Sequence, residues 1–210
     1  METIIIGVLL LASVVGLTFI IERGLALRLT KVIPPPVLGA LEACRTADDL
    51  PMLRHICQQH PAALSRLLLL AEKNRHWSRV DNASALETSA RQEVSRLERG
   101  LVVLEIIVGV GPLLGLVGTI YGIMVVFSTM GASALGETNT LSEGIALALR
   151  ATFLGLITAI PSLIAWNYYN RKVESLAVEM AAVCDNFLHQ LYHGEEEASR
   201  ASEKPASRGV

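Results

Sequence analysis

The stretch GVGPLLGLVGTIYG, residues 109 to 122, contains five glycines and one proline among Leu, Val and Ile. Thr119 and Tyr121 carry its only polar side-chain atoms. Two interpretations fit such a composition. The stretch could be a glycine-rich loop that binds phosphate, or a helix whose small residues let another helix pack closely against it.

The surrounding sequence favours a membrane helix. The stretch lies within 31 uncharged residues, Ile106 to Gly136, and two further uncharged runs, Thr3 to Ile21 and Ala151 to Asn170, contain 19 and 20 residues. About 20 apolar residues are enough for a helix to cross a bilayer, and 51% of the 210 residues are hydrophobic. We therefore predict an all-α integral membrane protein with three transmembrane helices, two of them extended into long cytoplasmic helices.

The basic residues predict the orientation. Twelve of the 18 Lys and Arg residues lie between Arg23 and Arg99, five more follow from Arg171 on, and residues 128 to 143 contain none. Positive residues favour the cytoplasmic side, so we expect a periplasmic N-terminus and a cytoplasmic C-terminus. The predicted segments are a first transmembrane helix (1–22), a cytoplasmic helical region (23–100), a second transmembrane helix (101–130), a short periplasmic linker (131–143), a third transmembrane helix (144–170), and a cytoplasmic helix with a disordered tail (171–210).

An apolar seam runs toward the opening stretch. Ser84 and Glu87 form a capping-box pattern that predicts the start of a long helix. From there, apolar residues recur at steps of four and three, and the glycines continue the same rhythm. The third uncharged run carries a similar stripe of small residues after a second capping-box pattern, Thr140 with Glu143. We predict that the two small faces pack together, through Gly111, Gly115, Gly118, Gly122, Ala148, Ala151 and Gly155, with Pro112 and Pro161 in the same helices.

The phosphate-loop interpretation fails on several counts. The glycine spacing differs by one residue from a dinucleotide fingerprint, a proline occupies the turn, and no strand and crossover pattern precedes it. No other arrangement resembles a catalytic centre, so we predict a protein that is not an enzyme and has no cofactor. His189 and His193 lie four residues apart, but no third metal ligand is evident. No basic patch interleaved with aromatic residues suggests nucleic acid.

The polar residues within the predicted spans leave two questions open. Thr119 and Thr152 lie beside the small stripes of the two helices; each hydroxyl could bond its own backbone or contribute to a shared path that positions a proton. Neither can store a proton, so a carboxylate would have to come from another chain. Arg150 could extend to the outer surface of the membrane or pair with a carboxylate on a partner helix or a neighbouring subunit.

Residues 90 to 170, with RLERGLVVLEIIVGVGPLLGLVGTIYGIMVVF and GIALALRATFLGLITAIPSLIAWN, resemble the proton-channel family that includes ExbB, TolQ and MotA, and most closely its ExbB members. The resemblance implies a homopentamer in the bacterial inner membrane, with an ExbD-like single-span partner in its pore and a TonB-like protein as recipient of the energy. Thr119 matches the family threonine in GLxGTxxGI, and Thr152 matches the one in ATxxGL. Both face the partner's membrane aspartate in the family pattern.

The sequence departs from that pattern at two positions. Leu147 stands where many relatives have a glutamate, and Arg150 stands where an apolar or small polar residue is usual. We predict that Arg150, Leu147 and Tyr121 contact the pore or the partner. The alternatives are a TolQ-like role in envelope integrity and constriction, or a passive membrane scaffold assembled through the same small-residue faces.

Overall fold

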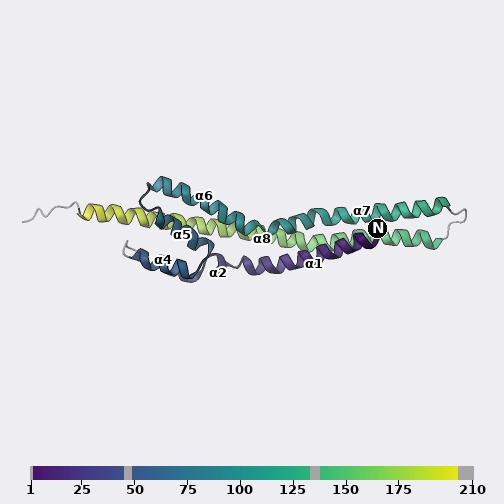
Figure 1. Cartoon of the computed structure of the whole chain (residues 1–210), viewed down its shortest axis with the longest axis horizontal. Helices are drawn as coiled ribbons and strands as arrows, with labels where there is room; N and C mark the ends of the chain where they lie inside the picture. The colour runs from purple at the N-terminus through teal and green to yellow at the C-terminus, as the bar shows by residue number, and fades with distance from the viewer. Residues whose placement is uncertain (1, 45–48, 133–137, 203–210) are drawn as a thin grey trace, which may run out of the picture. The chain divides into compact units, whose positions relative to one another are not determined.

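A computed structural model describes residues 2–44, 49–132 and 138–202, which form helices and no strand (Figure 1). The prediction of an all-α protein is confirmed for this part of the chain. The helices are α1 (Glu2–Ala26), α2 (Leu29–Val32), α3 (Pro35–Ala43), α4 (Leu50–Gln59), α5 (Ala63–Lys73), α6 (Arg79–Glu98), α7 (Leu101–Ala132) and α8 (Thr138–Ser202).

Three of these helices are long and apolar enough to cross a membrane, at Ile4–Ala26, Leu101–Ser128 and Gly144–Tyr192. They overlap the three uncharged runs, and the predicted all-α membrane protein with three spans is confirmed. Only the third span continues as one long helix; the second does not, because α6 and α7 are separate helices. The chain divides into two compact units. We call Met1–Leu25 with Glu98–Arg171 the membrane unit, and Ala26–Leu97 with Lys172–Val210 the extramembrane unit.

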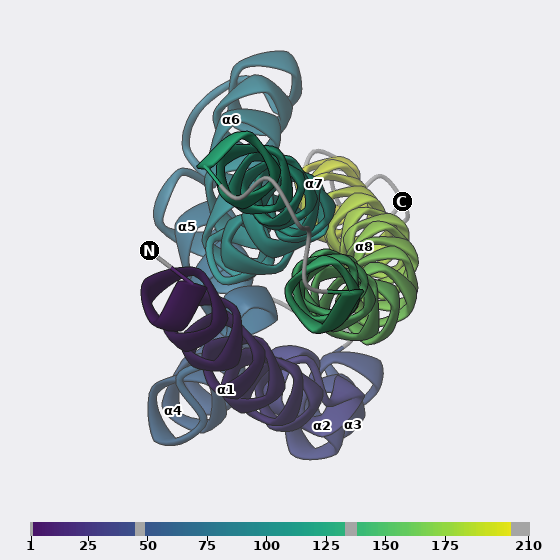
Figure 2. The ribbon, with the colours of Figure 1, turned by 90° about the vertical axis from the view of Figure 1, so that its right-hand side faces the viewer.

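Within the membrane unit, α1 packs against α7 and α8, and Figure 2 shows the three helices beside one another. A Cβ atom at Gly16 would lie 3.1 Å from Ser162 Oγ and 3.3 Å from Ile107 Cδ1. Farther along α1, the hydroxyl of Tyr169 donates a hydrogen bond of 2.7 Å to the carbonyl oxygen of Ile20. Glycines therefore bring α1 close to both of the other spans.

The predicted start of the long helix at Ser84 is wrong. Helix α6 begins at Arg79, and the side chain of Ser78 accepts a hydrogen bond of 3.1 Å from the backbone N–H of Asp81. The Ser78 hydroxyl in turn donates to the Asp81 carboxylate at 2.7 Å. The helix start is thus stabilised one and a half turns earlier, by a serine and an aspartate in place of the expected serine and glutamate.

The apolar seam was expected to continue without a break from the polar region into the membrane, but α6 and α7 are separate helices. Arg99 and Gly100 form a turn between them. Glycine has a low helix propensity, and the side chain of Arg23 occupies the space that a Cβ at residue 100 would need. The line of apolar residues and glycines is therefore interrupted by a turn, although its steps of four and three continue in the sequence.

Helix α8 continues unbroken past Arg171, as expected, and extends to Ser202. The tail that was predicted to be disordered is therefore helical as far as Ser202. At the other end, α8 begins at Thr138, so the second capping-box pattern lies inside the helix and does not start it. The side chains of Thr140 and Glu143 lie outside the described part of the chain.

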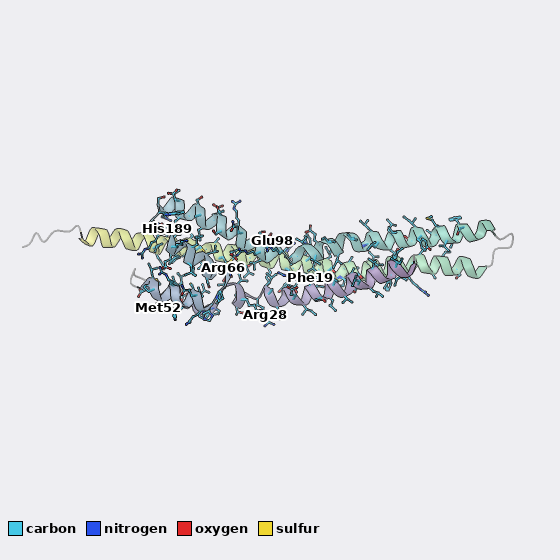
Figure 3. The ribbon with its side chains drawn as sticks, in the orientation of Figure 1. Phe19, Arg28, Met52, Arg66, Glu98 and His189 are labelled. Atoms are coloured by element: carbon cyan, nitrogen blue, oxygen red, sulfur yellow. The ribbon has the colours of Figure 1, made fainter. Side chains whose placement is uncertain are left out.

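The extramembrane unit has its own hydrophobic core, to which α3, α4, α5, α6 and α8 contribute. Helix α3 begins directly at the second proline of the Pro34–Pro36 run, since proline is well tolerated in the first turn of a helix. Across this core, Arg66 on α5 (labelled in Figure 3) binds the Glu93 carboxylate of α6 with two bonds of 2.9 and 2.5 Å. Arg96 adds a third bond of 2.7 Å.

Candidate functional site

Helices α7 and α8 are in contact through backbone and small side chains. A Cβ at Gly155 would lie 2.6 Å from the carbonyl oxygen of Gly111, and one at Gly122 would lie 2.9 Å from the carbonyl oxygen of Gly144. Neither distance leaves room for a side chain. Close approach gains van der Waals contact, which drives helix association where lipid is as apolar as the helices themselves.

The residues that the sequence placed on the two small faces lie along this contact. Gly111 faces Gly155 and Ala159, Gly115 faces Ala151 and Thr152, Gly118 faces Ala151, and Gly122 faces Gly144 and Ala148. Pro112 lies half-buried within α7, and Pro161 lies exposed within α8. Each proline lacks an N–H and so leaves the carbonyl four residues earlier without its helical partner.

Thr152 forms a hydrogen bond across this contact. Its hydroxyl donates to the carbonyl oxygen of Gly115 on α7, at 3.3 Å. The bond depends on the glycine, because a Cβ at residue 115 would lie 3.0 Å from Thr152 Cα and would push α8 away. Of the two roles left open for this threonine, the local one, a bond to its own helix, is not the one that the structure shows.

Thr119 does bond its own helix. Its hydroxyl donates to the carbonyl oxygen of Leu116, three residues earlier, at 2.6 Å. The acceptors of the two threonines, Gly115 and Leu116, are nevertheless consecutive residues of α7. Both side chains are half-buried. The structure thus brings the two hydroxyls to one turn of α7, at the edge of the small-residue contact.

The hydrogen bonding determines what the two hydroxyls can do next. A hydroxyl has one proton to donate and lone pairs that accept. Both protons are directed at backbone carbonyls, so the oxygens are left as acceptors for an incoming donor. The sequence has no Asp or Glu between Glu105 and Glu137. A titrating acid at this level of α7 would therefore have to be supplied by another helix.

The remaining predicted site residues lie elsewhere. Arg150 is exposed and forms no ion pair with another described side chain. At 100° per residue it points about 160° away from Thr152 around α8, and Tyr121 points as far from Thr119 around α7. Neither residue shares a face with its neighbouring threonine. The side chain of Leu147 lies outside the described part of the chain.

The contribution of α1 to the contact was not predicted from the sequence. A Cβ at Gly24 would lie 2.9 Å from the hydroxyl oxygen of Tyr169, and Gly16 meets Ser162. Gly16 and Gly24 are eight residues and so about 80° apart around the helix, and this spacing does not reveal the contact from the sequence. Of the two histidines spaced four residues apart, His189 lies with its Nε2 2.8 Å from a guanidinium nitrogen of Arg79, and the side chain of His193 is outside the described residues.

Comparisons with known proteins identify the family. Residues 59–182 match the sequence model of the MotA/TolQ/ExbB proton channel family. The match covers more than half of the chain, and the chain belongs to this family. The membership predicted from the two motif blocks is confirmed.

Relatives of two kinds are similar to the chain. It is 46% identical over 81 residues to the biopolymer transport protein ExbB of Helicobacter pylori, covering 39% of this chain and 56% of that protein. It is 37% identical to ExbB of Aquifex aeolicus, with coverage of 45% and 64%. It is 34% identical to the Tol-Pal system protein TolQ of Pseudomonas aeruginosa, with coverage of 53% and 49%. The matched part thus spans about half to two thirds of each relative.

Proposed function

We propose that the chain is the proton-channel subunit of an inner-membrane energy-transducing complex of the ExbB type. With an ExbD-like partner, the complex uses the proton-motive force to energise TonB-dependent transport across the outer membrane. The observation that carries this proposal is the pair of hydroxyls, Thr119 and Thr152, held by consecutive backbone carbonyls of α7.

The chemistry of the pair suits an acid supplied by the partner. A neutral carboxylic acid can donate its proton to a hydroxyl oxygen, whereas a carboxylate has nothing to donate. Two acceptors in a water-poor contact therefore favour the protonated form of a facing acid. When the acid ionises, this interaction is lost and the partner helix is free to move. A proton taken up on one side and released on the other then drives one cycle of movement.

The assembly follows from the family resemblance. We propose that five copies of the chain surround the single-span helices of the partner, with a TonB-like protein receiving the movement. The small-residue contact is compatible with such an arrangement, because it holds α7 and α8 of one copy together and leaves large apolar side chains on their other faces exposed. Lipid and neighbouring copies would cover those faces, and the positive-inside rule gives a periplasmic N-terminus.

The experiment is to replace both threonines and follow TonB-dependent uptake. Thr119→Ala with Thr152→Ala should abolish uptake while the complex still purifies intact, since small residues still fit the contact. The matched control is Thr119→Ser with Thr152→Ser, which keeps both hydroxyls and should retain uptake. Full uptake in the double alanine variant would favour a passive scaffold.

The partner can be identified in the same preparation. Mass spectrometry of the complex purified in detergent should detect a small protein with one N-terminal membrane helix that contains an aspartate. Absence of such a protein from an active complex would refute the proposed mechanism, because the chain has no carboxylate of its own near Thr119.

A TolQ-like role is the second candidate. The chain is 34% identical to the P. aeruginosa TolQ over 53% of its length, so the similarity extends to relatives of both kinds. Deleting the gene distinguishes the two roles. Loss of TonB-dependent uptake with intact detergent resistance supports the ExbB role, and sensitivity to detergents with normal uptake supports the TolQ role.

A further inference from the structure

Glu105 is the only charged residue of α7. It lies within the apolar span Leu101–Ser128, two residues before Ile107, which lies against Gly16 of α1. Along the helix it is about 7.5 Å from Gly100, where the side chain of Arg23 is packed. The Glu105 carboxylate is exposed and forms no hydrogen bond or ion pair with another described side chain. It is therefore a charge within the span that the chain itself does not neutralise.

Around α7, Glu105 points away from both neighbouring helices. At 100° per residue it lies about 160° from Ile107, which faces α1, and about 120° from Gly111, which faces α8. Figure 2 shows α1 on one side of the α7–α8 pair. Thr119, by contrast, is only about 40° from Glu105 around the helix. The carboxylate and the Thr119 hydroxyl therefore share the face of α7 that α1 and α8 leave open.

This open face is apolar except at two levels. Leu116 and Ile123 lie on it on either side of Thr119, with 54% and 48% of their surface exposed. Glu105 comes 14 residues before Thr119 in the sequence, or about 21 Å along the helix. A second helix packed along the face would meet an acceptor hydroxyl at one level and a carboxylate about four turns nearer the start of α7.

The charge of Glu105 calls for a cation from outside the chain. A carboxylate in a membrane span is costly, and such groups usually pair with another ionisable group. The basic residues of the membrane unit are Arg23, Arg99, Arg150 and Arg171. None of them forms an ion pair with Glu105. A lipid headgroup could supply an ammonium, but lipid tails cannot bond the Thr119 hydroxyl on the same face, whereas a helix with polar side chains at both levels can.

We propose that the partner segment on this face carries a Lys or Arg side chain that pairs with Glu105. This rests on the proposed function, in which a titrating acid of a single-span partner faces Thr119. The cation and the acid are then about 21 Å apart on the partner, which is about 14 residues of helix or about six of extended chain. The ion pair does not depend on the proton that the acid carries. It therefore holds one end of the partner while the other end is released in each cycle.

The test measures how much partner protein copurifies with the full chain in mild detergent, by quantitative mass spectrometry. Glu105→Gln removes the charge at nearly unchanged size. It should lower the amount of partner retained per chain about tenfold or more, because the partner's cation is left unpaired. Glu105→Asp keeps the charge and should retain the partner. Glu179→Gln is the matched control, since Glu179 is an exposed residue of α8 in the extramembrane unit, and it should behave like the wild type.

Exchange of the two charges tests the pair itself. Glu105→Lys should release the partner, and replacing the partner's Lys or Arg at the stated spacing with Glu should restore its retention. A partner with no Lys or Arg at that spacing, or unchanged retention with Glu105→Gln, overturns the proposal. Full retention with lost uptake also overturns it, because Glu105 would then be a proton acceptor. The proposed function fails by a different result, full uptake in Thr119→Ala with Thr152→Ala, which leaves Glu105 intact.

Discussion

Replacing Gly155 with alanine tests the small-residue contact most directly. The new Cβ would lie 2.6 Å from the carbonyl oxygen of Gly111 and 3.2 Å from Gly115 Cα. Both obstacles are backbone atoms, so no side-chain rotation relieves the overlap. The helices have to separate by nearly 1 Å to restore an ordinary contact, and the hydrogen bond from Thr152 to Gly115, already 3.3 Å long, would break.

The expected cost can be estimated from two opposing effects. Overpacking of this kind typically costs about 1–3 kcal/mol, and the lost interhelical hydrogen bond adds about 0.6 kcal/mol. In the opposite direction, alanine stabilises a helix relative to glycine by up to about 1 kcal/mol. The net prediction is a destabilisation of about 1–3 kcal/mol. Gly109→Ala is the matched control, because nothing lies within 4 Å of a Cβ there; it should be neutral or slightly stabilising.

The assay is reversible unfolding of the chain in mixed micelles with increasing denaturing detergent, followed by circular dichroism. Gly155→Ala should unfold at a lower detergent fraction than the wild type, and Gly109→Ala should not. If Gly155→Ala proves as stable as Gly109→Ala, the close contact between α7 and α8 is refuted.

Three further predictions concern the extramembrane unit. Asn82→Ala should lower the free energy of unfolding by about 1–3 kcal/mol, because the buried Asn82 amide donates to the Ala71 carbonyl. Hydrogen bonds from Arg66 hold the pKa of Glu93 below its ordinary value. The stability that Glu93 contributes is therefore fully present above the unfolded pKa of about 4.3 and is lost as the pH falls through the lower, folded value. Glu93→Gln should flatten this acid limb of the plot of unfolding free energy against pH. Burial raises the pKa of Cys57 to about 11, so iodoacetamide at pH 8 should alkylate it at least about 100-fold more slowly than a free thiol.

Two of these predictions have a specific control or a result that would contradict them. For Glu93 the comparison is Glu87→Gln, which removes the exposed partner of Arg91 and should leave the acid limb unchanged because exposed pairs contribute little. An acid limb that stays the same in Glu93→Gln contradicts the ion pair. For Cys57, rapid alkylation in the folded chain, before any loss of helical signal, contradicts its burial.

The three spans and the small-residue faces could be predicted from sequence because they depend on composition and on a repeat along one helix. Uncharged runs long enough to cross a bilayer are visible in the sequence, and the spacing of the glycines shows that they share one face of the helix. The position of the turn at Arg99–Gly100 could not be predicted, because it involves the side chain of Arg23 from a distant part of the chain. The start of α6 was missed because Ser84 with Glu87 matches the capping-box pattern, whereas Ser78, six residues earlier, is followed at the same spacing by Asp81.

The hydrogen bonding of the threonines was beyond the sequence for a different reason. Both Thr119 and Thr152 have a backbone carbonyl available in their own helix, and only the register of α8 against α7 decides between a local and an interhelical bond. That register depends on how several glycines fit together. The sequence identified the residues beside the contact, and the structure determined which carbonyl each hydroxyl reaches.

The contact between α7 and α8 also has an entropic consequence. Glycine and alanine have no side-chain rotamers, so forming the contact restricts no side-chain torsions in these residues. For the same reason the contact cannot accommodate a disturbance by changing rotamers, as a core of leucine and methionine can. A force applied at Thr152 must therefore displace a stretch of helix backbone as one piece, which makes the contact suited to passing on movement undiminished.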